Sequence, residues 1–478
     1  MDMQPIDLQQ TARWLPADMD TPISLFKGMA GGHGILLESA EVDGRWGRYS
    51  VLVCDMVLIV RCEQGKLAVH VNDQRLDALK CLDGQDFLPA LRQLMAAIRL
   101  LPPENIPDLP PITRALYGYL GFGMASLFNA RLRKTMPVDE AECTLCLPGT
   151  CIVFDHLYNR LCQISLNGHR TLVSGRDFPQ LQESQVDEQA LAASLAQACP
   201  NADGYQDWVR RIRTMLACGE AIQVVPSVRF GCPYTGDPFE LYRRMRRLNA
   251  SPYMFYMNLP DLVLFGSSPE VMVRCSSGQL TLSPIASTRR RGRDEREDQF
   301  LAGELLNDPK ERAEHVMLVD LGRNDLGRIA SAGSVHVDRY MQIQRFSHVM
   351  HLTSSVTVKL RKDFDALDVL AATFPAGTVS GAPKIRAMEI IREIEGQSRG
   401  PYAGSIGWIG LDQGPVNLDM GITIRSMWHR QGVLNWQAGG GIVHDSDPEL
   451  EWKEVCNKSA IMRLVLQPKE ANDVSAHR

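Results

Sequence analysis

The sequence lacks the features of a secreted, membrane-spanning or nucleic-acid-binding protein. Its 51 Lys and Arg residues are outnumbered by 56 Asp and Glu residues, whereas nucleic-acid-binding proteins carry an excess of basic charge. The first residues, Met1–Pro5, have neither the basic start nor the apolar core of a signal peptide. The uninterrupted apolar runs are too short to cross a bilayer. We therefore expect a cytoplasmic protein that contacts neither a membrane nor nucleic acid.

The 12 cysteines are scattered along the chain and do not form a compact disulfide framework. Cys143 and Cys146 make one C-x-x-C pair, and Cys151 and Cys162 follow. A structural zinc site needs a second closely spaced pair, which the sequence does not contain. We therefore expect reduced thiols and no zinc centre.

Strand-like and helix-like segments alternate along the chain. In the first part, branched and apolar residues predict strands over residues 35–39, 50–53 and 57–60, and helical periodicity covers residues 87–101. Further on, the patterns predict helices over residues 205–219 and 381–396 and strands over residues 421–425 and 432–436. A polar stretch near residues 175–188 is typical of a linker. We predict a two-lobed α/β (α+β) protein of mixed sheets packed with surrounding helices, with domains over residues 1–175 and 200–466.

Two Glu-x-x-Glu pairs, Glu311/Glu314 and Glu451/Glu454, occur far apart in the sequence. Each follows an Asp-Pro dipeptide, which favours the start of a helix, and the spacing places both carboxylates of a pair on one helix face. If the two faces meet, four carboxylates need a cation, and oxygen ligands favour Mg²⁺. The alternative is that both pairs lie on solvated helix faces beside Lys and Arg.

Three further features favour a small ligand with carboxylate groups. The run Gly439–Gly441 follows a predicted strand and allows close backbone approach to an anion. Arg425 ends the preceding strand and could pair bidentately with a carboxylate. Lys384 lies in the first turn of a predicted helix, where backbone N–H groups point outward. Each feature alone is common in proteins without such a ligand.

Over roughly residues 200 to 465 the chain resembles the chorismate-utilising enzymes and, among them, the large subunits of anthranilate synthase. The strings that carry the resemblance are residues 222–227, 268–270, 284–289, 311–325, 349–352, 374–384, 423–425, 439–443 and 454–458. The N-terminal part matches more loosely. The resemblance implies a chorismate-binding catalytic domain over residues 200–466, preceded in the sequence by an N-terminal domain with an effector site.

The resemblance also implies roles for particular residues. Glu314 and Glu454 would bind Mg²⁺ directly, with Glu311 and Glu451 nearby or bridged by water, and the ion would hold the ring carboxylate of chorismate. Glu270 would be the general acid that protonates the departing C4 hydroxyl, since hydroxide is a poor leaving group. The residues expected to bind the rest of the substrate are Tyr402, Arg425, Gly439, Gly440, Gly441, Ala286, Thr288 and Lys458. His351 and Thr378 resemble residues close to the ring, and His351 would assist the loss of pyruvate.

Two positions predict the nucleophile. Relatives that add water place a Lys at the position of Gln223, and Gln cannot act as a base at neutral pH. Aminodeoxychorismate synthases place a nucleophilic Lys at the position of Ala286. Gln223 with Ala286 therefore predicts attack by ammonia at C2 and anthranilate as the product. The family pattern has Gly where Ser287 stands, and this departure bears on the exact activity.

The sequence after residue 465 is too short for a glutaminase domain. We therefore expect ammonia from a separate glutamine amidotransferase subunit and a hetero-oligomer. The alternatives are an aminodeoxychorismate synthase, an enzyme that stops at 2-amino-2-deoxyisochorismate, and a catalytically inactive homologue. The intact set of carboxylates argues against an inactive homologue, because carboxylates clustered together repel one another and an inactive protein would be free to lose them.

Residues 36–40 and 252–254 resemble the family's effector motifs and predict inhibition by tryptophan. Glu38 would bind the effector's ammonium and Ser39 a polar group, and Pro252, Tyr253 and Met254 complete the site, Tyr253 and Met254 packing on the indole. The alternative is a buried strand with a capped end.

Overall fold

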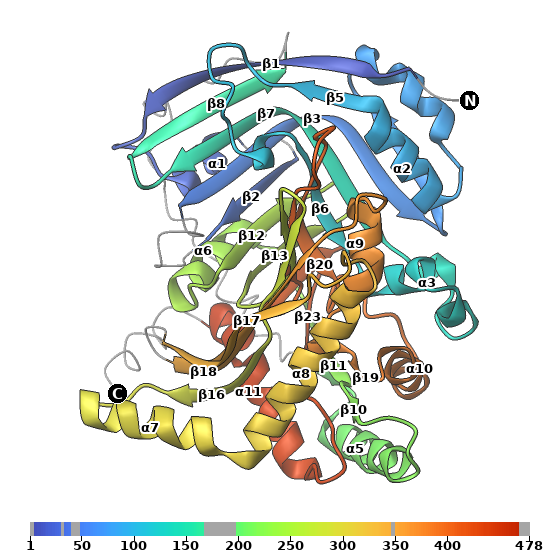
Figure 1. Cartoon of the computed structure of the whole chain (residues 1–478), viewed down its shortest axis with the longest axis vertical. Coiled ribbons are helices and arrows are strands. Elements are labelled where there is room, and N and C mark those ends of the chain that lie inside the picture. Colours follow the sequence, from blue (N-terminus) through green and yellow to red (C-terminus); the bar gives the residue numbers. More distant parts are fainter. Residues whose placement is uncertain (1–3, 30–32, 40–47, 167–196, 346–348, 468–478) are drawn as a thin grey trace.

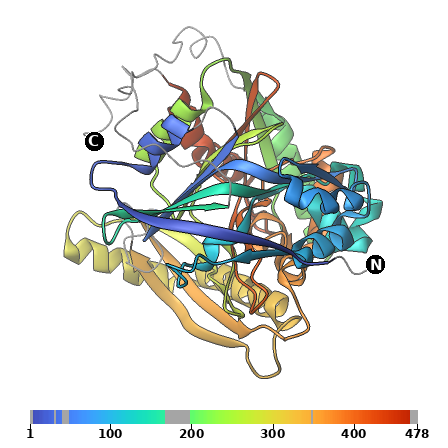
Figure 2. The same cartoon turned by 90° about the horizontal axis from the view of Figure 1, so that it is seen from above.

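The computed structural model describes residues 4–29, 33–39, 48–166, 197–345 and 349–467. Strands of the N-terminal part lie above the C-terminal part, and helices surround the lower strands (Figure 1). Figure 2 shows from above how the N-terminal strands cross over the rest of the molecule. No helix among these residues combines the length and apolar character that crossing a membrane requires. The predicted mixed α/β class is confirmed.

The N-terminal part is organised around two long strands, β3 (Tyr49–Glu63) and β7 (Cys143–Asp155), which pair antiparallel along most of their length. Every residue of β7 is buried, which explains its run of small and apolar residues, including its cysteines. On the other edge of β7 lies β8 (Arg160–Leu166), which pairs in turn with β1 (Ile6–Pro16). The predicted strands 50–53 and 57–60 are thus one strand with a bulge near Met56.

Strand pairing continues from the N-terminal part into the C-terminal part. β2 (Gly34–Glu38) lies between β3 and β12 (Tyr253–Asn258), and it pairs antiparallel with both. A second connection joins β6 (Ala115–Leu120) to β20 (Ser405–Gly410). Backbone hydrogen bonds therefore couple the two parts directly.

Helices α8 (Pro309–Gly327) and α11 (Pro448–Leu466) carry the two Glu-x-x-Glu pairs, as predicted. The Asp308 side chain accepts from the N–H groups of Lys310 and Glu311, and Asp447 caps α11 in the same way. In both helices Pro occupies the first helical position. The Asp-Pro dipeptide alone was therefore enough to predict where each of these helices begins.

The remaining elements complete the fold. The other strands are β4 (Lys66–Val71), β5 (Ile98–Leu101), β9 (Gln197–Cys199), β10 (Gln223–Val224), β11 (Ser227–Pro233), β13 (Val263–Ser268), β14 (Val271–Ser276), β15 (Gln279–Leu282), β16 (Ile285–Arg290), β17 (His336–Arg345), β18 (Val349–Lys359), β19 (Gly381–Ala382), β21 (Leu418–Ile422), β22 (Ser426–Arg430) and β23 (Val433–Gly439). The other helices are α1 (Pro22–Met29), α2 (Phe87–Ala97), α3 (Ala125–Phe128), α5 (Ala202–Ala217), α6 (Pro238–Leu248), α7 (Glu295–Asn307), α9 (Ala366–Thr373) and α10 (Lys384–Glu395).

Three expected segments differ from the structure. In the helix predicted over residues 381–396, Gly381 and Ala382 form the strand β19, and α10 begins at Lys384. The helix predicted over residues 87–101 ends at Ala97, because Ile98 is extended and β5 pairs parallel with β1. Pro102 follows and also favours extended backbone before it. The strand predicted over residues 421–425 ends at Ile422, and Arg425 adopts a positive φ of 50°. The hairpin is instead formed by β22 and β23.

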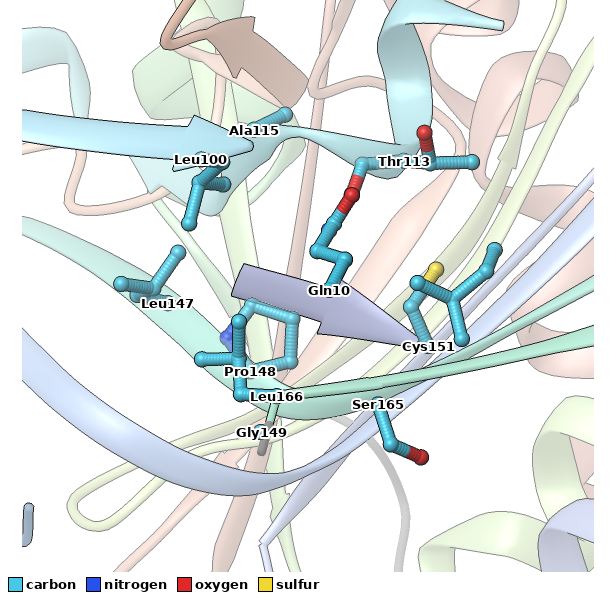
Figure 3. Close-up of a pocket in the computed structure, with 11 residues that line it drawn as sticks. Gln10, Leu100, Thr113, Ala115, Leu147, Pro148, Gly149, Cys151, Ser165 and Leu166 are labelled. Carbon is cyan, nitrogen blue, oxygen red and sulfur yellow. The ribbon is translucent and has the colours of Figure 1, made fainter. Parts of the chain in front are cut away.

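A small void lies between the strands of the N-terminal part, beside Gln10 and Thr113 (Figure 3). Gln10 Nε2 donates to the Thr113 carbonyl over 2.9 Å, and Gln10 Oε1 is buried without a partner among the described residues. The void measures about 10 Å³, which is room for about one water molecule. It is a packing defect with one polar wall, and it is too small for a substrate.

A buried ion pair ties several chain segments together in the C-terminal part. The side chains of Arg399 and Glu395 are each 1% exposed and pair at 2.6 Å. Arg399 also donates to the carbonyls of Val379 and Val225, and Glu395 accepts from the backbone and side chain of Ser227. Both charges are therefore satisfied inside the protein.

We expect Arg399→Met to lower the free energy of unfolding by roughly 3–5 kcal/mol, because it leaves a buried carboxylate without its partner. Arg399→Met combined with Glu395→Gln should recover part of that loss, since no unpaired charge remains. Denaturant unfolding of the wild type and both variants measures the difference. A single variant as stable as the wild type would contradict the assigned role of this pair.

Candidate active site

Helices α8 and α11 bring the two Glu-x-x-Glu pairs together. Burial raises the pKa of Glu314, and the charges of Glu311 and Glu454 raise it further. Burial also raises the pKa of Glu451, with a further contribution from Glu454. The charge of Glu454 on α11 acts on Glu314 of α8, so the two pairs lie close enough to interact electrostatically.

Cationic side chains occupy part of this acidic cluster. Lys458 Nζ lies 2.7 Å from Glu454 Oε1 and donates to the Gly439 carbonyl over 3.1 Å. Arg289 lies 3.6 Å from Glu311. Within the part of the chain that the structure describes, no three His, Cys, Asp or Glu side chains are placed to hold one metal ion. The carboxylates are gathered, and a lysine ammonium is held among them.

Gly440 faces a small polar space in the same cluster. A Cβ at this position would lie 3.1 Å from Glu451 Oε2, 3.6 Å from the Tyr205 hydroxyl and 3.7 Å from Glu454 Oε1. Glu451 Oε2 and the Tyr205 hydroxyl are both buried and lack hydrogen-bond partners among the described residues. The glycine leaves this space open, as a binding role for the glycine run requires.

The other two glycines of the run pack closely against neighbouring residues. A Cβ at Gly439 would lie 2.4 Å from the Pro226 carbonyl, and one at Gly441 would lie 2.6 Å from Gln223 Nε2. Gln223 itself is 4% exposed. The glycine run therefore packs directly against the segment that carries the residue expected to select the nucleophile.

Arg425 and Tyr402 lie close enough to interact electrostatically, and Tyr402 lies beside the Gly439 backbone. Burial lowers the pKa of Arg425, and Tyr402 and Glu454 partly oppose this effect. Burial raises the pKa of Tyr402 to about 12, and the Gly439 backbone counteracts part of the rise. A positive φ at a residue other than glycine is strained, and such strain clusters at functional sites.

Glu270 lies between β13 and β14 and lines a cavity of about 50 Å³. Desolvation raises the pKa of Glu270 to about 7, against the lowering effects of Thr378 and Lys458. Thr378 lines the same cavity, together with Leu321 and Asp325 of α8. A carboxyl group with this pKa is partly protonated near neutral pH and can donate a proton.

Lys384 differs from the expectation that it would meet a ligand. Its ammonium lies 2.7 Å from Asp325 Oδ2 and donates to the Thr373 carbonyl. Burial lowers the pKa of Lys384, and Asp325 counteracts the effect. Lys384 thus anchors the start of α10 to α8.

His351 lies on β18, where its backbone is opposite Thr288 of β16 and Gln344 of β17. The pairing between β16 and β18 shifts between Ala286 and Thr288, so Ser287 is the extra residue of a bulge. The side chains of residues 286–288 lie outside the described part of the structure. Their expected contacts with substrate stay predictions.

The expected effector residues lie where β2 meets β12, with Glu38 opposite Met254. The Glu38 carboxylate accepts from the Tyr242 hydroxyl over 2.6 Å and from Arg246 Nε over 3.0 Å. Tyr253 donates to Asp419 over 2.5 Å, in a separate network. Pro252 and Ser39 lie at the same ends of these strands, and Ala40 of the motif lies outside the described residues. An effector ammonium at Glu38 would have to compete with Arg246.

Sequence reasoning did not identify Tyr205 as part of the site. Tyr205 lies on the same face of α5 as the buried residues Val209, Ile212 and Leu216, which form one apolar stripe. A tyrosine in such a stripe resembles an ordinary core residue. Only the spatial arrangement places its hydroxyl beside the carboxylates.

Residues 59–463 match the family of chorismate binding enzymes. The chain belongs to this family, and the resemblance found in its motifs is confirmed. It is 38% identical to anthranilate synthase component 1 of Aquifex aeolicus, with 96% of this chain and 95% of the relative covered. The component 1 protein of Thermus thermophilus is also 38% identical, with 95% and 97% covered.

Solved structures agree with the fold. Anthranilate synthase component I from Streptococcus pneumoniae matches with a TM-score of 0.69 and 31% identity, covering 94% of this chain and 99% of that one. The menaquinone-specific isochorismate synthase from Escherichia coli matches with a TM-score of 0.70 at 22% identity, covering 97% and 96%. The second match shows the fold alone.

We expect Glu270→Gln to change how stability depends on pH. The pKa of Glu270 is raised in the folded state, so the folded protein binds more protons than the unfolded chain between the ordinary value of 4.5 and about 7. Wild-type stability should fall relative to the variant as pH rises through this range. Melting temperatures of both proteins across the range measure the effect. A constant difference between them would contradict the raised pKa.

Proposed function

We propose that this chain is the chorismate-binding subunit of an anthranilate synthase. It forms anthranilate, pyruvate and water from chorismate and ammonia, as part of tryptophan biosynthesis. The observation that carries the proposal is its similarity to anthranilate synthase component 1 proteins over nearly the full length of both chains. The arrangement around Glu270 and Gln223 supports the same conclusion.

Glu270 acts as the general acid. It protonates the departing C4 hydroxyl, which leaves as water while the amine nitrogen bonds to C2. A pKa of about 7 lets the side chain donate a proton near neutral pH and remain ready to be reprotonated. Thr378 lies in the same cavity and favours the ionised form that follows donation.

Gln223 sets the choice of nucleophile. An amide cannot remove a proton from water, whereas ammonia attacks without prior deprotonation. The buried amide lies against Gly441, so it is held in one place. Ala286 offers no amine for covalent attack at C2, which opposes the aminodeoxychorismate synthase alternative.

Cationic groups hold the carboxylates of the substrate. Arg425 and Tyr402 would bind the enolpyruvyl carboxylate together with backbone N–H groups of the glycine run. Lys458 is close enough to the run to assist. His351, on the neighbouring strand β18, would assist the elimination of pyruvate, in which C2 loses its proton and the C3–O bond breaks.

The acidic cluster fits a hydrated Mg²⁺ ion. The raised pKa values of Glu314 and Glu451, the unpartnered Glu451 Oε2 and the open space at Gly440 all favour a bound cation. Glu314 and Glu454 would bind it directly, and Glu311 and Glu451 through water, once Lys458 releases Glu454. The bound ion supplies positive charge for the ring carboxylate of chorismate.

A separate glutamine amidotransferase subunit would supply the ammonia, and the complex would act in the cytoplasm. The printed name of the relatives, component 1, supports an enzyme of more than one component. Tryptophan would act as a feedback inhibitor at the junction of β2 and β12. This junction is bonded to both parts of the chain, so a ligand there could shift one against the other if it binds the two states differently.

Product identification tests the proposed function. The purified chain with chorismate, Mg²⁺ and an ammonium salt should give anthranilate, detected by fluorescence and mass, together with an equal amount of pyruvate. Glutamine in place of ammonium should give no product without an added amidotransferase subunit. With ammonium omitted, neither isochorismate nor salicylate should form. A non-aromatic amine as the end product would refute the assignment.

Ser39→Phe should weaken inhibition by tryptophan and leave turnover unchanged, because Ser39 lies at the strand junction and is not among the residues assigned to the reaction. Titration of activity with tryptophan for the wild type and the variant measures this effect. The matched control is Ser334→Phe, since Ser334 hydrogen-bonds to Ser331 and Lys359, far along the chain from the effector strands. Equal sensitivity of the wild type and Ser39→Phe would exclude the effector site.

A further inference from the structure

The Tyr205 hydroxyl is a buried polar group that the proposed reaction does not use. The residue is 0% exposed, and its hydroxyl has no hydrogen-bond partner among the described residues. Leaving such a group unpaired in the interior costs free energy. Its ring packs against Trp208 and Trp452, with centroids 6.4 and 5.8 Å away. Phenylalanine would make the same ring contacts, so packing does not explain the hydroxyl.

A second unpartnered atom lies close by. Glu451 Oε2 and the Tyr205 hydroxyl lie 3.1 and 3.6 Å from a single point beside Gly440, and Glu454 Oε1 lies 3.7 Å from the same point. The phenol and the carboxylate do not bond to each other in the structure. A single oxygen atom near that point would be within or close to hydrogen-bonding distance of both groups.

We propose that Tyr205 is a positioning residue of the cation site. Its hydroxyl and Glu451 Oε2 both accept hydrogen bonds from one water molecule of the coordination shell of the ion, and that water occupies the space beside Gly440. This inference rests on the proposed function, specifically on its Mg²⁺ site. Glycine at position 440 is needed to leave room for the water.

The arrangement has a chemical logic. A water molecule bound to a cation directs both of its hydrogens away from the ion, so it needs two acceptors. Glu451 supplies one acceptor and Tyr205 supplies the other from a different helix. Groups of this kind orient the coordination shell, and their loss typically costs 10–100-fold in metal affinity.

Tyr205→Phe tests the inference, with binding of Mg²⁺ to the whole chain measured by calorimetry. We expect the variant to bind Mg²⁺ about tenfold more weakly, or worse. Without Mg²⁺ its melting temperature should equal or exceed that of the wild type, because an unpaired buried hydroxyl has been removed. The increase in melting temperature on adding Mg²⁺ should be smaller than in the wild type.

Two controls separate this role from general packing. Tyr234→Phe removes another buried tyrosine hydroxyl, one that already donates to the Asp237 carbonyl, and should leave Mg²⁺ affinity unchanged. Gly440→Ala fills the space directly and should weaken Mg²⁺ binding even if Tyr205→Phe folds poorly. Its matched control is Gly303→Ala in α7, where an added Cβ meets no atom within 4 Å.

The possible outcomes are distinct. If the wild type binds Mg²⁺ and Tyr205→Phe binds it equally well, the inference is wrong and the proposed cation site stands. If the variant loses stability without Mg²⁺ and keeps the full increase on adding it, Tyr205 is structural only. If the wild type binds no Mg²⁺ and turns over chorismate in excess chelator, the cation site itself is wrong, and the inference fails with it.

Discussion

The buried pair of Arg399 and Glu395 fixes the segments from which the active site is built. Arg399 bonds the carbonyls of Val225 and Val379, and Glu395 bonds Ser227. Val225 and Ser227 follow Gln223, while Val379 follows Thr378. Ser227 is also paired with Gly439 across β11 and β23. One interior ion pair thus links the segment after Gln223, the segment after Thr378 and, through Ser227, the strand that ends at Gly439.

Around this framework the site contains both acidic and basic side chains. Burial and the neighbouring carboxylates raise the pKa values of Glu314 on α8 and Glu451 on α11, which expresses the cost of holding like charges in a partly buried place. Arg425 and Lys458 supply positive charge near the glycine run. Under the proposed function, one carboxylate of the substrate would meet a bound cation and the other would meet Arg425.

The sequence predicted the features that depend on local chemistry. Asp-Pro dipeptides predicted the starts of α8 and α11, and Gly396 predicted the end of α10. It did not reveal contacts made in three dimensions. Tyr205 follows the apolar period of α5, so its polar neighbours from α11 could not be seen. Glu38 looked available for a ligand because Arg246 is distant in sequence. Residues 98–101 continued a helical pattern, but parallel pairing with β1 outweighed that tendency.

The contact between Gln223 and Gly441 constrains how enzymes of this shape can diverge. A side chain at position 441 would collide with the amide at 223, whose nitrogen lies 2.6 Å from where the Cβ would stand. A side chain at 441 can therefore be accommodated only if the Gln223 amide moves, and any residue at 223 has to leave space for the backbone at 441. Substitutions at positions 223 and 441 are therefore expected to depend on each other, because the two residues share one space in the interior.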